Sequence, residues 1–156
     1  MGQKILVALD ESENAMRAVK FISESFTPNH EITLFSVIQD TPAICAMNSP
    51  SLTPYFVSQQ AAFCELEDRK KTLVMDALKE ARELLLRAGF QKENIKTKVE
   101  DKQKGVARTI INEASTGYDT IVMGRRGLSR IQEFFLGSVS QKVLQSAHGV
   151  SVVLVE

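Results

Sequence analysis

A strict alternation of short apolar runs with segments of helical periodicity constrains the fold of this chain more than any other feature. Most of the apolar runs lack a regular polar–apolar alternation, which indicates strands buried on both faces. This alternation predicts an α/β fold with one domain, residues 1–156, in which helices cover both faces of a five-stranded parallel sheet. The expected strands are residues 4–9, 31–38, 94–100, 119–124 and 150–155.

The helical segments between these runs are marked by apolar spacing and by capping residues. Ser12 is the expected N-cap of the first helix, and Gly89 is expected just past the end of a long helix over 63–88. The predicted core stripe of the long helix is Leu73, Ala77, Ala81, Leu84 and Ala88. A last helix over 137–147 is expected to turn Val139, Val143, Leu144 and Ala147 inward. Strand 94–100 has one polar face, so we expect it at an outer position.

Residues 39–60 contain prolines and small polar residues without a regular period, which predicts a long loop. This loop follows the second strand, so it leaves from the edge of the sheet where ligands of parallel sheets bind. Two interpretations remain open: a lid or partner surface, or a loop without a role. The residues behind these interpretations are Pro42, Cys45, Met47, Pro50, Pro54 and Tyr55.

Composition excludes several classes of protein. The 19 basic and 19 acidic residues cancel, whereas a general nucleic-acid binder carries a basic excess. No apolar stretch approaches the roughly 18 residues of a membrane-spanning helix, so we expect no membrane partner. Cys45 and Cys64 have no metal-like spacing. We expect both as ordinary thiols, which favours a reducing compartment and a cytoplasmic location.

The candidate site lies where strands of the predicted sheet end. Asp10 follows the first strand, and Gly124, Arg125, Arg126 and Gly127 end the fourth. Gly137 and Ser138 start the last helix, where free N–H groups and the helix dipole favour an anion. The two arginines add charge-assisted donors, so these residues together predict a phosphate site. In the alternative interpretation the glycines form ordinary turns and Ser138 is only a cap.

The spacing Gly-x2-Gly-x9-Gly-Ser, at Gly124, Gly127, Gly137 and Ser138, resembles the nucleotide motif of the universal stress protein family. The runs at residues 7–12, VALDES, and 136–140, LGSVS, are also similar to that family, and the resemblance covers residues 3–155. It implies a Rossmann-like fold of the adenine nucleotide alpha hydrolase-like type. Because the glycine pattern is kept, the chain resembles the branch of the family that binds ATP.

The resemblance also implies roles for single residues. The phosphates of ATP, ADP or AMP bind at Gly124, Gly127, Gly137 and Ser138. Asp10 helps to hold the ribose and the nearby phosphates, and is the candidate for contact with a nucleotide-bound Mg²⁺. The main chain near Val37 faces the adenine. Ala8, Met123 and Val139 line the same pocket. Many relatives have a proline where this chain has Ser151, a departure that affects strand entry and not the nucleotide loop.

Other nucleotide and catalytic motifs are missing from the sequence. There is no Gly-Lys-Ser/Thr of a Walker A loop and no GxGxxG fingerprint. Asp10 and Asp101 both end predicted strands, as acids do in a receiver domain, but resemblance to such a domain also needs a fifth helix, and none is expected after residues 150–155. His30 and His148 have no metal or triad spacing, so we expect both at the surface and no catalytic residue.

Three functions are therefore compared. The first is an ATP-binding stress-response regulator that acts through nucleotide-dependent conformation or partner binding. The alternatives are a slow ATP hydrolase and a structural dimer with an unused pocket. The apolar strand 150–155 ends the sheet, and an exposed apolar edge favours pairing, so a homodimer through this strand is expected.

Overall fold

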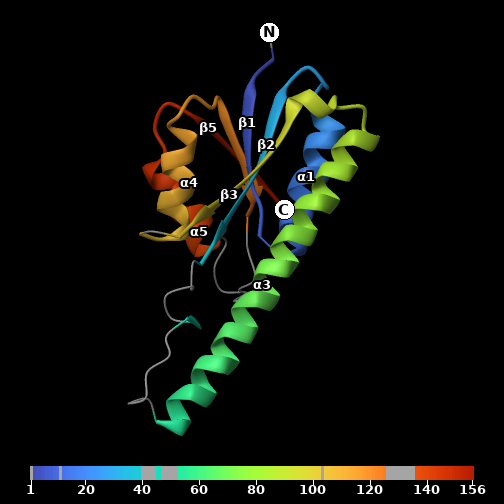
Figure 1. Ribbon diagram of the computed structural model, residues 1–156. Coiled ribbons are helices and arrows are strands. Elements are labelled where there is room, and N and C mark those ends of the chain that lie inside the picture. The colour runs from blue at the N-terminus through green and yellow to red at the C-terminus, as the bar shows by residue number, and fades with distance from the viewer. Residues whose placement is uncertain (1, 11, 40–44, 47–52, 103, 126–135) are drawn as a thin grey trace.

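The computed structural model describes residues 2–10, 12–39, 45–46, 53–102, 104–125 and 136–156. Five strands form one sheet in the order β3-β2-β1-β4-β5, and all neighbouring strands are parallel (Figure 1). The strands are β1 (Lys4–Ala8), β2 (Glu31–Ile38), β3 (Ile95–Asp101), β4 (Thr120–Gly124) and β5 (Ser151–Val155). The predicted α/β fold and the five predicted strands are confirmed.

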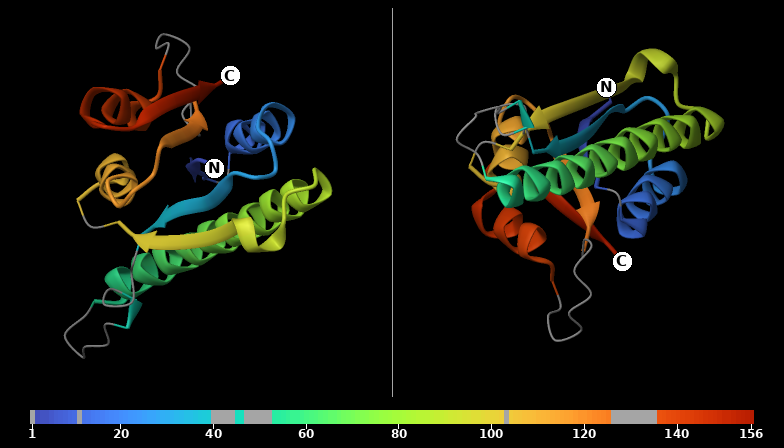
Figure 2. Two further views of the ribbon diagram at one scale, coloured as in Figure 1. Left: turned by 90° about the horizontal axis from the view of Figure 1, so that it is seen from above. Right: turned by 60° about the horizontal axis from the view of Figure 1, so that its bottom comes forward.

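Helices cover both faces of the sheet, as Figure 2 shows. The helices are α1 (Glu13–Ser25), α3 (Pro54–Arg87), α4 (Val106–Ala114) and α5 (Ser138–Ser146), with a 3₁₀ turn η1 (Lys92–Asn94). α1 and α3 pack on one face, and α4 and α5 on the other. The chain winds from β1 outward to β3 and then crosses to β4 and β5 on the other side of β1. The winding thus reverses between β1 and β4, the kind of position where open parallel sheets bind ligands.

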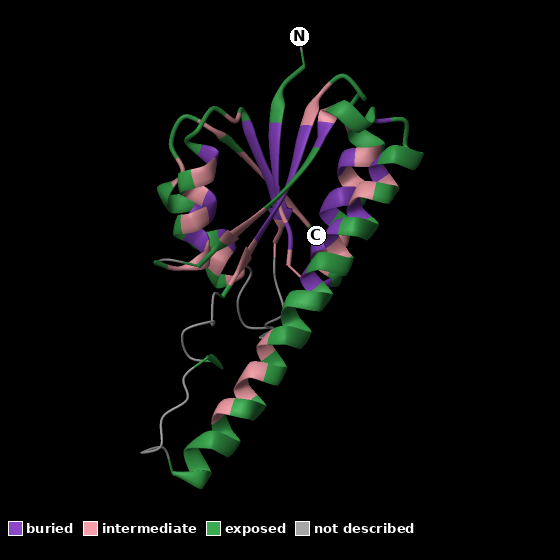
Figure 3. Cartoon of the chain, viewed as in Figure 1, coloured by how far each residue is buried: buried purple, intermediate pink, exposed green. Residues whose placement is uncertain are grey.

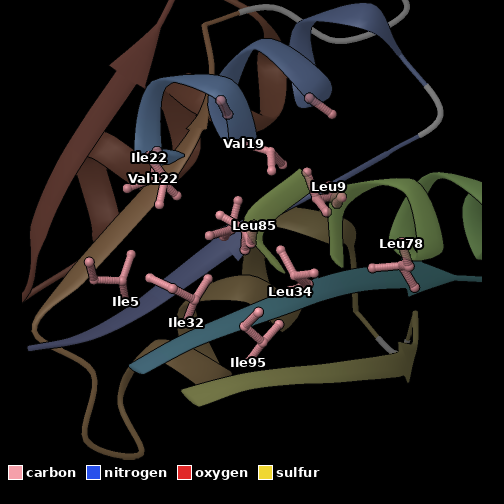
Figure 4. Close-up of a cluster of buried hydrophobic side chains, with 14 of the residues drawn as sticks. Ile5, Leu9, Val19, Ile22, Ile32, Leu34, Leu78, Leu85, Ile95 and Val122 are labelled. Carbon is pink, nitrogen blue, oxygen red and sulfur yellow. The ribbon is translucent and has the colours of Figure 1, made fainter. Parts of the chain in front are cut away.

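Alternate residues of β1, β2, β4 and β5 join two separate hydrophobic clusters, whereas β3 joins only the cluster under α1 and α3. Ile5 and Val7 of β1 join the cluster under α1 and α3, shown in Figure 4 with Leu78 and Leu85 of α3. Leu6 of β1 joins the cluster under α4 and α5. Each fully buried side chain of this size contributes about 1.5–3 kcal/mol of transfer free energy. The two clusters fix the strands, and thereby the edge of the sheet where the strands end.

Of three local predictions outside the long helix, two are confirmed and one is wrong for a single residue. Ser12 caps α1, because its Oγ accepts a hydrogen bond from the Ala15 N–H at 3.4 Å. β3 is an outer strand, as its polar face predicted. Leu144, expected inward, is exposed, and Ser140 is buried in α5 instead. The Ser140 hydroxyl donates to the Gly124 carbonyl at 3.0 Å, which satisfies this polar group inside the fold.

The long helix begins at Pro54, nine residues before the predicted start at 63. Thr53 is its N-cap and accepts a hydrogen bond from the Phe56 N–H at 3.2 Å. Proline suits the first helical position because the N–H it lacks has no partner there. The predicted loop over 39–60 is therefore wrong for residues 54–60. Residues 40–44 and 47–52 of that segment lie outside the described residues.

The core stripe of α3 is also wrong, by about one residue. The buried residues are Val74, Leu78, Ala81 and Leu85, so that only Ala81 was predicted. Leu73 is 53% exposed, and Leu73, Ala77 and Leu84 line a groove between α3 and α1. Two neighbouring apolar stripes run along the helix. The stripe with Val74, Leu78 and Leu85 packs against the sheet, and the stripe with Leu73, Ala77 and Leu84 faces the groove beside α1.

Cys45 and Cys64 form a disulfide, with their Cα atoms 5.9 Å apart. The expectation of two ordinary thiols is therefore wrong. Because α3 starts at Pro54 and runs back toward the sheet, Cys64 comes alongside the segment that contains Cys45. In the described part of the chain, no helix combines the length and the apolar sequence needed to cross a membrane.

Candidate functional site

The ends of β4 and α5 are joined by backbone hydrogen bonds. The Arg125 N–H donates to the Val155 carbonyl at 2.8 Å, and the Gly137 N–H donates to the Arg125 carbonyl at 3.0 Å. These bonds bring the glycine at the end of β4 next to the glycine before α5, although twelve residues separate them in the sequence. Arg126 and Gly127 lie outside the described residues.

The N-terminus of α5 has no side-chain cap. Its N-cap is Gly137, which has no side chain to accept from the first-turn N–H groups. Ser138 is the first helical residue and is exposed. Uncapped N–H groups and the positive end of the helix dipole form an anion site, and a serine hydroxyl adds a donor. The arrangement fits a phosphate group.

Gly124 has a packing reason for being glycine. A Cβ atom built there would lie 3.0 Å from the Asn14 Cβ and 3.1 Å from the Asn14 carbonyl oxygen in the first turn of α1. The close approach of α1 to the end of β4 thus leaves little room for a side chain at this position even without a ligand. Sequence reasoning assigned Gly124 to the ligand or to an ordinary turn, and missed its contact with Asn14.

Arg125 pairs with Glu156 at the carboxyl end of β5. The guanidinium is partly buried and the carboxylate is largely exposed. An exposed pair of this kind contributes at most about 1 kcal/mol. The predicted phosphate cation is therefore engaged by a carboxylate that a bound phosphate would have to displace.

Asp10 lies at the end of β1 and is half-buried. One carboxylate oxygen accepts the Ser12 N–H at 2.7 Å, in the turn that leads into α1. The chain before it is fixed to β2, since the Leu9 N–H donates to the Phe35 carbonyl at 2.8 Å. The buried Ser36 hydroxyl donates to the Leu9 carbonyl at 2.8 Å. Sequence reasoning missed this positioning role of Ser36, although a serine inside the apolar run ITLFSVI was a signal.

The donor set around Asp10 suits a cation that arrives with phosphates. Among the described residues no group of three His, Cys, Asp or Glu side chains could hold a metal ion alone. Mg²⁺ is typically bound by one or two carboxylates together with substrate phosphates. The second carboxylate oxygen of Asp10 fits such a role.

Four predicted site residues form one apolar wall, which we define as Ala8, Val37, Met123 and Val139. Ala8 is opposite Phe35 of β2 and Met123 of β4 in the sheet register. All four belong to, or pack against, the hydrophobic cluster under α4 and α5. Met123 is buried, whereas the other three are half-buried. The structure thus brings this wall, Asp10 and the start of α5 to the carboxyl edge of the sheet.

Two perturbed groups lie on β3 and around α4, away from this wall. A hydrogen bond to Glu113, at 2.8 Å, raises the pKa of the exposed Lys98, and Glu100 adds to the shift. Burial raises the pKa of Tyr118, whose hydroxyl donates to the Glu113 carboxylate at 3.0 Å. These shifts have structural causes and mark no acid–base pair at the candidate site.

Comparison with known proteins identifies the family of this chain. The universal stress protein family matches residues 1–156, and the chain belongs to that family. It is 29% identical over 147 residues to the universal stress protein YxiE of Bacillus subtilis, covering 93% of each chain.

Solved structures show the same fold. The universal stress protein UspA from Lactobacillus plantarum matches with a TM-score of 0.71 at 23% identity, over 99% of this chain and 97% of that one. A universal stress protein in complex with cAMP matches with a TM-score of 0.62 at 19% identity, over 99% and 96%. At these identities the structures establish the Rossmann-like fold of the family and no ligand for this chain.

Proposed function

We propose that this chain binds an adenine nucleotide, ATP, ADP or AMP, at the carboxyl edge of its sheet. The observation that supports this most is the hydrogen bond from Gly137 to Arg125, which joins the end of β4 to the uncapped start of α5. The phosphates bind at Gly124, Gly127, Gly137 and Ser138. The adenine packs against the apolar wall, at the main chain of Val37. The related fold in complex with cAMP supports this class of ligand.

Magnesium enters this proposal with the nucleotide. It neutralises phosphate charge when bound, and the Asp10 oxygen that does not accept from Ser12 is its protein contact. The same carboxylate orients the ribose.

The protein acts, in this proposal, as a stress-response regulator and not as an efficient ATPase. Fast phosphoryl transfer needs a cation on the transferring group and a residue that positions water. Arg125 is engaged by Glu156. Nucleotide occupancy instead shifts a conformational or assembly equilibrium, through different affinities for the two states.

A homodimer through residues 150–155 completes the proposal. β5 is an outer strand, and its residues Val152–Val155 are half-buried in the single chain. A charge at Val153, as in Val153→Lys, should yield a monomer or an aggregate in light scattering. The cytoplasmic location stays part of the proposal. The Cys45–Cys64 pair makes it testable, because the cytoplasm keeps most thiols reduced. Alkylation of cells before lysis would report the state of both thiols.

The binding test compares two serines of one helix. Ser138→Ala removes a hydroxyl at the start of α5, and Ser146→Ala removes one at its end. A hydrogen bond to a charged phosphate is worth about 1.5–3 kcal/mol, so calorimetry should show ATP affinity falling about tenfold or more in Ser138→Ala. Ser146→Ala should bind as the wild type does. Equal affinity in the two variants, or no binding by the wild type, would overturn the proposal.

Two further variants separate binding from turnover. Gly127→Val should block the approach of the backbone to the phosphates and abolish binding while unfolding stays cooperative. Phosphate release with magnesium and excess ATP should stay below about one per second. Faster release that disappears in Asp10→Ala would show an enzyme.

A further inference from the structure

The inward stripe of α3 changes from apolar to polar where the helix passes the ends of the strands. Val74 and Leu78 are buried on the sheet. The same spacing of three and four residues, continued toward the N-terminus, places Lys71 and Glu67 on this stripe. In Figure 1 this half of α3 extends beyond the sheet on the side where β1 and β2 end. The polar residues therefore lie at the edge of the sheet that carries the ligand site.

A cavity of about 190 Å³ lies at this junction. Residues 37–39 at the end of β2, Glu67, Lys70 and Lys71 of α3, and Lys102 after β3 line it. The Lys102 N–H donates to the Ile38 carbonyl at 2.7 Å, which fixes Lys102 beside the end of β2. Pockets for whole small-molecule ligands measure about 300–1,000 Å³, so this cavity suits one small group.

The charges of the described residues that line the cavity do not cancel. Glu67, whose side chain is only 12% exposed, pairs with Lys70 at 3.3 Å. Lys71 and Lys102 form no side-chain ion pair or hydrogen bond with any other residue that the structure describes. Two positive charges thus remain beside one small cavity. An anion between them relieves their repulsion, and lysine binds phosphate as a point charge.

We propose that this cavity is a second anion subsite, which binds a phosphate group through Lys71 and Lys102. It lies at the β2–β3 end of the carboxyl edge, whereas Gly137 and Ser138 lie beyond β4, with β1 in between. The subsite goes beyond the proposed function, since it shares only Val37 with the nucleotide site. Its phosphate belongs either to a separate phosphorylated molecule or to the nucleotide itself.

The test is a titration with inorganic phosphate, which needs no nucleotide and so fails or succeeds independently of the proposed function. Amide shifts of residues 37–39 and Lys102 in NMR spectra report binding, with chloride at matched ionic strength as the blank. Lys71→Gln and Lys102→Gln should each weaken phosphate binding about tenfold, and the double variant should abolish it. Lys79→Gln removes the same charge from an exposed position of α3 outside the cavity, and should titrate as the wild type does.

A repeat with saturating ATP identifies the source of the phosphate. Phosphate shifts that persist with ATP bound indicate a separate phosphorylated ligand. Shifts that vanish in ATP-bound wild type indicate that the nucleotide fills the subsite. The proposal is wrong if the wild type shows no more shift than the chloride blank. It is also wrong if Lys79→Gln loses as much affinity as Lys71→Gln. All three lysines are exposed, so circular dichroism should show unchanged folds.

Discussion

The two halves of α3 differ in what holds them in place. The docked half, residues 74–87, buries Val74, Leu78, Ala81 and Leu85 against the sheet. The overhang, residues 54–73, has no buried residue (Figure 3). At a rise of about 1.5 Å per residue, it is about 30 Å long. Helices in proteins are stabilised mainly by packing of an apolar face. The overhang therefore depends on local devices: the Thr53 cap, the Cys45–Cys64 disulfide and pairs of charges along the helix.

The largest expected difference is in the free energy of unfolding of two leucine variants, one in each half of α3. Leu85 is fully buried, whereas Leu66 is 52% exposed. Leu85→Ala should lower the free energy of unfolding by about 2–5 kcal/mol, because it leaves a cavity in the core. Leu66→Ala should change it by no more than about 0.5 kcal/mol. Urea titration measures both. Similar losses in the two variants would mean that another surface covers the overhang in solution.

The second-largest expected effect comes from removing the disulfide, and it should be confined to the overhang. It links residues 19 positions apart in the sequence, and closing a loop of that order contributes about 3 kcal/mol. Reduction, or the double variant Cys45→Ser with Cys64→Ser, should speed hydrogen exchange in residues 54–70. Exchange in residues 74–87 should not change. An equal rise in both halves would show that α3 opens as one unit.

The contrast within α3 also explains what the sequence could predict. Residues 74–87 were recognisable as a helix because burial imposes a period on them. The start at Pro54 was missed because residues 54–62 bury no side chain and carry no apolar period, although Thr53 followed by Pro54 is a cap followed by a favoured first residue. Leu73 was taken for Val74 because two apolar stripes run side by side, and only tertiary contact distinguishes them.

Some features of the candidate site could likewise be predicted from the local sequence, whereas others depend on tertiary contacts. The strand ends that carry Asp10 and Gly124 follow from the apolar runs, and the start of α5 follows from its glycine. The engagement of Arg125 by Glu156 and the contact of Asn14 with Gly124 depend on strand order and helix docking. No local pattern encodes these contacts. For the same reason Lys71 and Lys102, thirty-one residues apart (102 minus 71), give no signal in the sequence.

A third and smaller effect comes from the cap of the overhang. Thr53→Ala removes the hydroxyl that accepts from the Phe56 N–H, and should cost about 1 kcal/mol of local helix stability. Thr72→Ala is the matched control. The Thr72 hydroxyl donates back to the Asp68 carbonyl, and alanine is the better helix former there. Faster exchange at residues 54–60 in Thr53→Ala but not in Thr72→Ala supports the cap. No difference between the two variants would show that the cap is dispensable.

The smallest expected effect comes from removing a charge pair of the overhang. Its dependence on salt concentration should distinguish the overhang from the docked half. The charges of α3 are spaced for three i,i+4 pairs, Glu65–Arg69, Glu67–Lys71 and Glu83–Arg87. Arg69 pairs with Glu65 at 2.6 Å, Glu67 pairs with Lys70 instead of Lys71, and no ion pair joins Glu83 to Arg87 among the described residues.

Both partners of the Arg69–Glu65 pair are largely exposed, so the pair should contribute about 0.3–0.5 kcal/mol at low ionic strength. Glu65→Gln should therefore speed exchange in the overhang slightly in dilute buffer. The difference should disappear at 1 M salt, where charges are screened beyond about 3 Å. Glu83→Gln, in the docked half, removes an acid that has no such pair and should leave exchange of residues 74–87 unchanged at either salt concentration. If Glu65→Gln has the same effect at both salt concentrations, the overhang is not held by charge pairing, and its helix must have a packing partner.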